Sequence, residues 1–298
     1  MVCHMHARAV VLAAPLLGLG AFALLEWVDW GAEPEPGAHP GDRLAIWELS
    51  ITAGIVVWAA LAGIGLRMME ELDSLPRKRS RSETASFLAF VYGAIALLLA
   101  IGGVTGLVNP TVLTGQQWKN ALLHVVAGAA ILPLLIAMKR IQLCAAEETA
   151  WSATASDIQR IRGLRRSMHT ATAALGAIVA LAVISTGALR DAVAAAGLTP
   201  LPDTFVLVYG AWFTGVLAAI YLHAFGAVDR RARWIMEQAA PLPDPGLESA
   251  EPFSTSVKLR AELTQELELG GDPRKNLEGL VAVLSPLVGA LLTRLGGL

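Results

Sequence analysis

Six long apolar stretches constrain the fold of this chain more than any other feature of its sequence. They cover residues 9–28, 49–66, 87–108, 121–138, 168–189 and 204–225. Each is close to the roughly 20 residues that a helix needs to cross a bilayer. Their interiors contain no Lys, Arg or Asp, and Glu26 is the only Glu. Because lipid cannot satisfy an open backbone, each stretch is expected to form a helix.

The sequence therefore predicts an all-α, polytopic membrane bundle of six transmembrane helices within residues 1–233. The stretches are continuous and rich in Ala, Leu and Gly, so they lack the alternating pattern of a transmembrane barrel. Charged residues make up 16% of the chain, whereas soluble domains average about 25%. A formal net charge of −2 gives no basis for nucleic-acid binding.

The distribution of Lys and Arg predicts the orientation of the bundle. With the N-terminus placed in the cytoplasm, fifteen Lys and Arg lie on cytoplasmic flanks up to Arg233, and three lie on the opposite side. The positive-inside rule then places both termini in the cytoplasm and the chain in the cell membrane. Four tryptophans fall at the expected outer boundary: Trp27, Trp30, Trp47 and Trp118.

The first stretch, 9–28, has an alternative interpretation as a cleaved signal peptide. Its apolar run is longer than the usual segment of about 7–15 residues. It also ends in Glu26 and Trp27 instead of the small residues that precede a cleavage site. We therefore expect it to be retained as a membrane anchor, and its removal would leave the rest of the topology unchanged.

The sequence lacks the signatures of common enzyme classes. It has no Gly-x-Ser-x-Gly elbow, no P-loop and no His-Glu-x-x-His pair. The centres of the apolar stretches carry no ionisable group, which argues against proton-coupled transport. We therefore expect no enzyme and no catalytic residue. A membrane anchor or effector is the first interpretation, and a small-solute channel or transporter without ion coupling is an alternative.

A metal- or haem-binding membrane protein is a further alternative, with weak candidate ligands. His169 and His223 approach the inner face on neighbouring stretches, as a bis-histidine haem would require. Cys3, His4 and His6 offer the soft ligands that suit Cu(I). Interfacial histidines are more often solvated, and the N-terminal cluster is a short terminus in a reducing compartment. The sequence thus predicts no cofactor.

After the last stretch the sequence predicts a Pro-rich linker over 234–256 and a cytoplasmic helical tail over 257–298. Within the tail, Asp272 and Pro273 are suited to the N-cap and first position of a helix that runs over 273–298. One side of this helix is an apolar seam. The seam comprises Leu277, Leu280, Leu284, Leu287, Leu291 and Leu295. The other side consists mainly of small residues, including Gly279, Ala282 and Gly289.

Such a helix has too little charge to be stable alone in water. It could lie in the inner leaflet, pair with copies of itself, bind a partner or insert as a seventh span. Pro286 in its middle and Arg294 near its end argue against a span. The sequence thus favours a non-enzymatic membrane protein whose seam forms a homo-oligomer or binds an unidentified partner.

Overall fold

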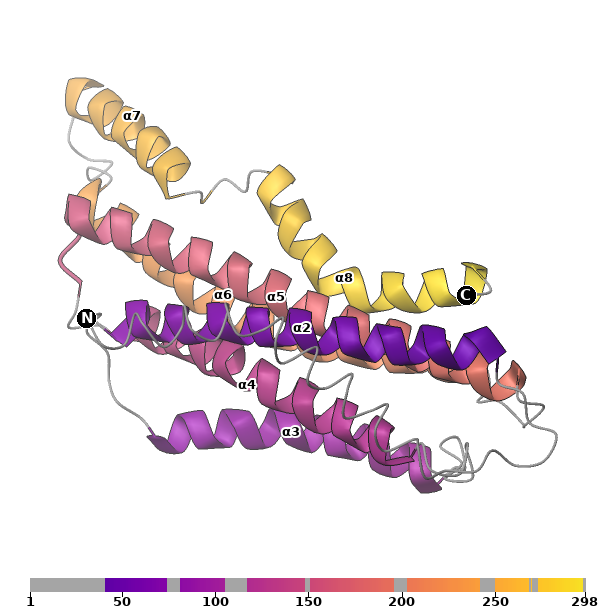
Figure 1. Cartoon of the computed structure of the whole chain (residues 1–298). Coiled ribbons are helices and arrows are strands. Elements are labelled where there is room, and N and C mark those ends of the chain that lie inside the picture. The colour runs from indigo at the N-terminus through magenta and orange to yellow at the C-terminus, as the bar shows by residue number, and fades with distance from the viewer. Residues whose placement is uncertain are drawn as a thin grey trace.

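The computed structural model of the chain is almost entirely helical over the residues that the structure describes, with no strand among them. Those residues are 41–73, 81–104, 117–147, 151–195, 203–241, 250–267, 269 and 273–296. The helices are α2 (Gly41–Asp73), α3 (Arg81–Val104), α4 (Gln117–Ala146), α5 (Ala155–Ala195), α6 (Asp203–Ala239), α7 (Ala250–Glu266) and α8 (Pro273–Gly296) (Figure 1). The predicted all-α class is confirmed.

Four helices of the described part are long and apolar enough to cross a membrane. The segments are Ala45–Asp73, Val125–Ala146, Ala155–Ala195 and Thr204–Ala239. They contain the predicted stretches 49–66, 168–189 and 204–225 and residues 125–138 of the stretch 121–138, and their length and composition are those of a membrane protein. Shorter apolar segments lie in α3, over Ser82–Leu97, and in α8, over Val281–Leu291. The first predicted stretch, 9–28, lies outside the described residues, so the count of six spans stays a prediction.

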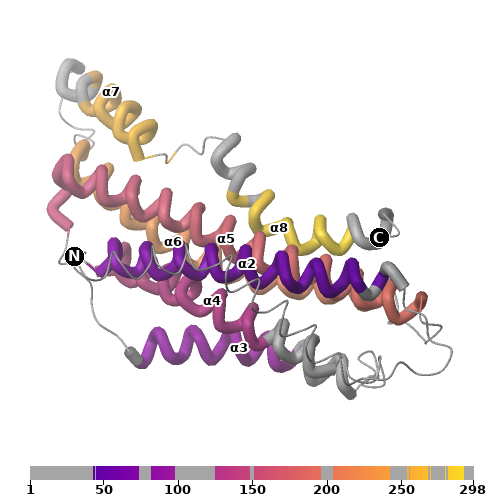
Figure 2. Tube along the Cα trace, in the orientation of Figure 1, coloured from indigo at the N-terminus to yellow at the C-terminus, as the bar shows by residue number. Residues whose placement is uncertain are grey.

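Helix α5 is the centre of the bundle. It contacts α2, α4, α6 and α8, while α3 lies at the margin beside α4 (Figure 2). Its buried side chains occur all along its length, and several are small, such as Ala171 and Ala174. Small residues let neighbouring helix backbones approach closely, which is the usual basis of helix association in membranes.

The contact between α2 and α5 contains polar groups as well as apolar ones. Trp47 and Trp58 on α2 are fully buried. The Ser50 Oγ lies 3.1 Å from the Ser185 Oγ, at hydrogen-bond distance. Trp47, which the sequence places at the outer boundary, lies in the second turn of α2 with its side chain packed inside the protein, and its depth in a membrane stays a prediction.

Charged side chains gather where α2, α4 and α6 end and α3 and α5 begin, which we call the basic end (left in Figure 1). Ion pairs join different helices there. They include Arg140 Nη1 to Asp73 Oδ1 at 3.0 Å, Lys139 Nζ to Glu83 Oε2 at 3.6 Å, and Arg165 Nη2 to Asp229 Oδ1 at 3.3 Å. This is the end that the sequence assigns to the cytoplasm, and the orientation itself stays a prediction.

Both ends of the predicted 234–256 linker are helical, since α6 extends to Ala239 and α7 begins at Ala250. Helix α7 returns to the basic end of the bundle. Arg260 Nε donates a hydrogen bond to the Ala240 carbonyl oxygen at 2.9 Å, and Arg162 Nε donates one to the Glu266 carbonyl oxygen at 2.8 Å. The predicted tail is therefore in contact with the bundle instead of separate from it.

Candidate functional site

Helix α8 packs along α5 and α6, and this contact is the candidate functional site (Figures 1 and 2). Near its start, Gly279 lies against the side chains of Tyr221 and His169. Further along, Gly289 lies against Ala180 and Ile184. Helix α8 thus follows α5 through most of the apolar stretch 168–189, and it runs in the same direction as α5.

Two glycines of the bundle make this contact a backbone-to-backbone one. A methyl group on Gly176 of α5 would clash with the Ala282 carbonyl oxygen and would lie 2.6 Å from the Ser285 Oγ. A methyl group on Gly210 of α6 would lie 2.8 Å from both the Ala290 Cβ and the Pro286 carbonyl oxygen. Only glycine allows α8 to lie this close at the two positions, as small-residue packing in membranes requires.

The outward face of α8 is aliphatic. Val281, Val288 and Leu291 are 58%, 49% and 42% exposed, whereas Val283 and Ala290 are buried. A helix that docks on a protein from water normally presents its larger apolar residues inward and polar ones outward. Helix α8 does the reverse over this segment. Its outer face therefore suits lipid or another apolar protein surface.

The predicted seam lies partly on this outward face. Leu284 and Leu287 are half-buried and Leu291 is exposed. The side chains of Leu277, Leu280 and Leu295 lie outside the described residues. No observation tests the seam as an interaction surface. The structure adds that the small-residue side of α8 is the side packed on the bundle of its own chain.

The two candidate haem ligands lie on different sides of α6. His169 packs beside Tyr221, with ring centroids 6.1 Å apart, on the side where α8 docks. His223 lines a small hollow together with Phe87 of α3 and Lys139 of α4. A bis-histidine haem needs both imidazoles directed at one iron between them. The structure does not bring these two side chains together.

The candidate metal ligands Cys3, His4 and His6 lie outside the described residues. Within the described ranges, no group of three or more His, Cys, Asp or Glu side chains is placed to hold a metal ion. Cys144 is a buried thiol on α4. No metal site is assigned to the described part of the chain.

An apolar cavity of about 220 Å³ lies between α3, α4, α5 and α6. Aromatic side chains contribute much of its wall, including Tyr92, Tyr209 and Phe213. The Tyr92 hydroxyl donates a hydrogen bond to the Gly128 carbonyl oxygen at 2.8 Å, which holds α3 against α4. None of the lining residues that the structure describes is charged.

The sequence of α5 contains a signal for the docking site that lies outside the predicted seam. Thr172, Gly176 and Ala180 are small and follow one another at intervals of four along α5. This spacing places them on one face of a helix, and small residues at such intervals mark close helix contacts in membranes. The pattern indicates where α5 accepts a neighbour, although it does not identify α8 as that neighbour.

Comparison with known proteins reveals no relative: no family model, no curated protein and no solved structure matches the chain. The fold alone defines the class, an all-helical protein with several helices apolar enough to span a membrane. Any finer functional assignment depends on the contacts described above.

Proposed function

We propose that this chain is a non-enzymatic membrane anchor or effector that assembles through α8. In this proposal the bundle crosses the cell membrane and α8 lies within the apolar layer beside α5. The outward face of α8, which we call the stripe and which comprises Val281, Val288 and Leu291, meets a second copy of the chain. One observation carries the proposal. Small residues of α8 dock on Gly176 and Gly210, while Val281, Val288 and Leu291 point away from the bundle.

In this proposal α8 lies within the membrane, although Pro286 and Arg294 argue against a membrane span on sequence grounds. Figure 1 shows that α8 is bent partway along, and Pro286 is the proline inside it. A proline within a helix removes a backbone hydrogen bond. Neighbouring helices compensate for this loss in membrane proteins. Pro286 lies directly against α6 at Gly210, which supports such compensation.

Cysteine crosslinking in native membranes tests the assembly. Leu291→Cys, in a chain with Cys3→Ser and Cys144→Ala, should give a disulfide-linked dimer on mild oxidation. Val208→Cys is the matched control, because Val208 is exposed to a similar degree on α6 but lies off the α8 stripe. Equal crosslinking from both positions, or none from Leu291→Cys, would contradict assembly through α8.

Charge placed on the outward face of α8 at Leu291, and beside it at the half-buried Leu284, gives an independent readout. Leu284→Asp and Leu291→Asp together should reduce the oligomer size in mild detergent, because burying two carboxylates in an apolar contact is strongly unfavourable. Glu278→Ala, on the same helix, should leave the size unchanged. A double variant with the same oligomer size as the parent would show that the stripe is no interface between copies. If the double variant instead no longer co-purified with a different protein that the parent retains, α8 would bind a partner and not a second copy.

The apolar cavity supports a second candidate function, the uncoupled passage of a small neutral solute. Ala182 lines the cavity from α5, and Ala182→Phe would fill much of its volume. If the cavity lies on a pathway, this variant should slow the entry of glycerol or urea into proteoliposomes, measured by light scattering. Equal rates for the parent, the variant and protein-free vesicles would exclude this function for these solutes.

A further inference from the structure

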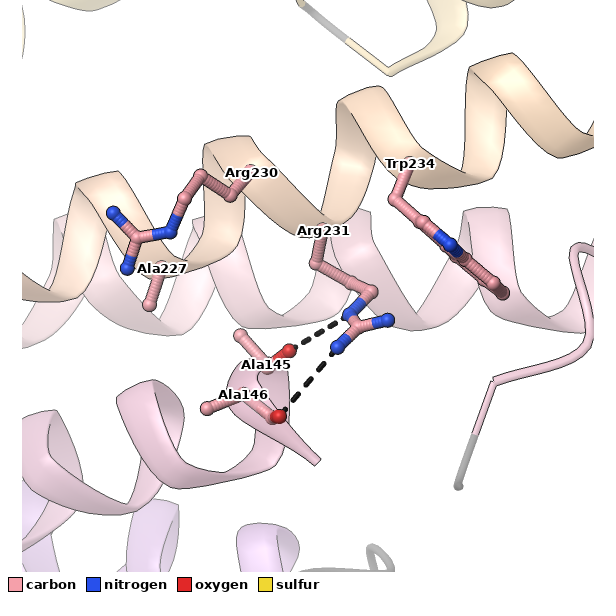
Figure 3. Close-up of a pocket in the computed structure, with 6 residues that line it drawn as sticks. All are labelled: Ala145, Ala146, Ala227, Arg230, Arg231 and Trp234. Carbon is pink, nitrogen blue, oxygen red and sulfur yellow. Dashed lines mark hydrogen bonds between the residues drawn. The ribbon is translucent and has the colours of Figure 1, made fainter. Parts of the chain in front are cut away.

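Two cavities in the described part of the chain differ in which of their polar groups are engaged. Figure 3 shows the cavity at the basic end, where Arg231 of α6 donates hydrogen bonds to the carbonyl oxygens of Ala145 and Ala146, at 2.9 and 3.5 Å. This arginine joins α6 to the end of α4 within its own chain. The apolar cavity between α3, α4, α5 and α6 is different, because its wall includes a hydroxyl group that is not engaged in this way.

The apolar cavity lies at the depth of the predicted membrane spans. Every residue that lines it belongs to one of the apolar stretches 87–108, 121–138, 168–189 and 204–225. Val125 of α4 lines the cavity and is 68% exposed, so the cavity reaches the flank of the bundle at this residue. In a bilayer, a flank at this depth faces hydrocarbon. A ligand that enters here therefore comes from the lipid phase.

Aromatic rings of α6 form one wall of the cavity. Tyr209 and Phe213 both line it, and their rings meet edge to face with centroids 4.8 Å apart. Phe205, one turn earlier, stacks on Tyr209 with a centroid distance of 6.0 Å. These two contacts fix the position of the Tyr209 ring. A further ring in the cavity can make the same kinds of aromatic contact.

The hydroxyl of Tyr209 is the group that is left to satisfy. Tyr209 is 4% exposed, and its hydroxyl makes no hydrogen bond within the part of the chain that the structure describes. The hydroxyl of Tyr92, on the opposite wall, already donates to the Gly128 carbonyl oxygen at 2.8 Å. A buried hydroxyl without a partner is unfavourable. Tyr209 therefore has one hydrogen bond to donate to a ligand in the cavity.

The volume and the chemistry of the cavity indicate the size of that ligand. A cavity of about 150 Å³ lined by Leu, Ile and Phe stays dry and binds benzene. The volume here is about 220 Å³, which leaves room for one ring with a short substituent. An ordered water needs two to four polar partners, whereas most of this wall is hydrocarbon. An acyl chain would fill the space but would leave the Tyr209 hydroxyl without an acceptor.

We propose that this cavity binds an uncharged lipophilic molecule with one ring and one hydrogen-bond acceptor, such as an aromatic ketone. The ring lies against Tyr209 and Phe213, the acceptor receives the hydrogen bond of Tyr209, and the ligand enters from the lipid beside Val125. The site is independent of assembly through α8. It holds a ligand in place, so it does not require the passage of a neutral solute through the same cavity.

Equilibrium binding of radiolabelled acetophenone to the full chain in lipid nanodiscs tests the proposal, with the uptake of empty nanodiscs subtracted. Ethylbenzene is the matched ligand, because it has nearly the same shape but a methylene group in place of the carbonyl. The parent should show one saturable site. At equal concentration in the lipid phase, it should bind acetophenone about fivefold more tightly than ethylbenzene, the factor expected for one neutral hydrogen bond.

Three variants separate the hydrogen bond from the space. Tyr209→Phe keeps the ring and removes the donor, so it should bind the two ligands equally and keep the affinity of the parent for ethylbenzene. Ala182→Phe fills the cavity from α5 and should bind neither ligand. Ala211→Phe is the matched control and should bind as the parent does, because Ala211 is exposed on α6 and does not line the cavity.

Four results would overturn the proposal. They are uptake by the parent no greater than that of empty nanodiscs, equal affinity of the parent for the two ligands, an unchanged preference for acetophenone in Tyr209→Phe, and equal loss of binding in Ala182→Phe and Ala211→Phe. Saturable binding by a parent that does not speed the entry of glycerol or urea would support the ligand site while excluding passage of these solutes.

Discussion

The indole Nε1 of Trp58 on α2 donates a hydrogen bond to the backbone carbonyl oxygen of Ile178 on α5, 3.2 Å away. Trp58 is fully buried, and both residues lie within apolar stretches of their helices. Water does not reach this layer, so the N–H needs a partner from the protein. The bond therefore fixes how far along α5 the helix α2 is placed.

Trp58→Phe should lower the free energy of unfolding by about 1–2 kcal/mol, from the lost hydrogen bond and the smaller ring together. Thermal unfolding in detergent measures the change. Trp212→Phe is the control, because the Trp212 Nε1 is buried and has no hydrogen-bond partner among the described residues. A loss as large in Trp212→Phe would mean that the bond to Ile178 contributes nothing specific.

Gly176→Val should displace α8, because the new side chain occupies the space of the Ala282 carbonyl oxygen. A reporter cysteine at Ala290, which is fully buried, should then react with a maleimide about tenfold faster, as a shift of about 1.4 kcal/mol would give. Gly215→Val is the control, since a methyl group on Gly215 meets no atom within 4 Å. Unchanged reactivity in Gly176→Val would argue that α8 docks elsewhere.

Val288→Cys should resist a water-soluble maleimide in intact membranes and react after solubilisation in detergent. The reason is the proposed position of its outward-facing side chain in the apolar layer, next to Gly289, which packs on Ala180 and Ile184 of α5. Lys258→Cys on α7, an exposed position at the basic end, should react from one side of the membrane without detergent. Equal labelling of the two cysteines in intact membranes would place α8 in water.

Asp157→Asn should weaken the start of α5 by about 1 kcal/mol, the usual contribution of a helix cap. The Asp157 Oδ2 accepts hydrogen bonds from the backbone N–H groups of Ser152 and Thr154, each at 3.0 Å. Asp157 precedes the apolar stretch that begins at Met168. Burial acts to raise the pKa of Asp157, but these hydrogen bonds and the charge of Arg160 outweigh it and lower the pKa below its ordinary value of 3.8.

The sign of the pH dependence follows from this lowered pKa. A carboxylate with a lower pKa in the folded state stabilises that state above its unfolded pKa, and the contribution is lost as the pH falls through the folded value. The difference in melting temperature between the parent and Asp157→Asn should therefore be full at pH 7 and shrink below about pH 4. A difference that is constant down to pH 3 would contradict this assignment.

The helical class and the apolar helices could be predicted because lipid leaves a chain few alternatives. Uncharged stretches such as 168–189 have to satisfy their backbone internally, whatever they pack against. The side of α8 that docks could not be predicted by the same reasoning. In water the larger apolar side chains turn inward, which made the leucines the expected contact, whereas in lipid close packing favours glycine and alanine.

The candidate ligands and Trp47 show the limit of sequence reasoning about positions in space. His169 and His223 have similar expected depths, but depth does not fix the direction in which each side chain leaves its helix. Packing around α6 places them on different sides. Trp47 was expected to expose its ring to the headgroup layer, but its side chain is fully buried within the protein. Both outcomes depend on neighbours that lie far away in the sequence.

The glycines that receive α8 also set an order of events during synthesis. Gly176 and Gly210 leave the ribosome before α8, and 80 positions separate Gly210 from Ala290. At about 5–20 residues per second, the ribosome needs roughly 4–16 s to bridge that distance. In the proposed arrangement, the two glycines present bare backbone to the surrounding bilayer during this interval. Maturation of the bundle would then have a late closing step, in which α8 replaces lipid molecules along α5 and α6.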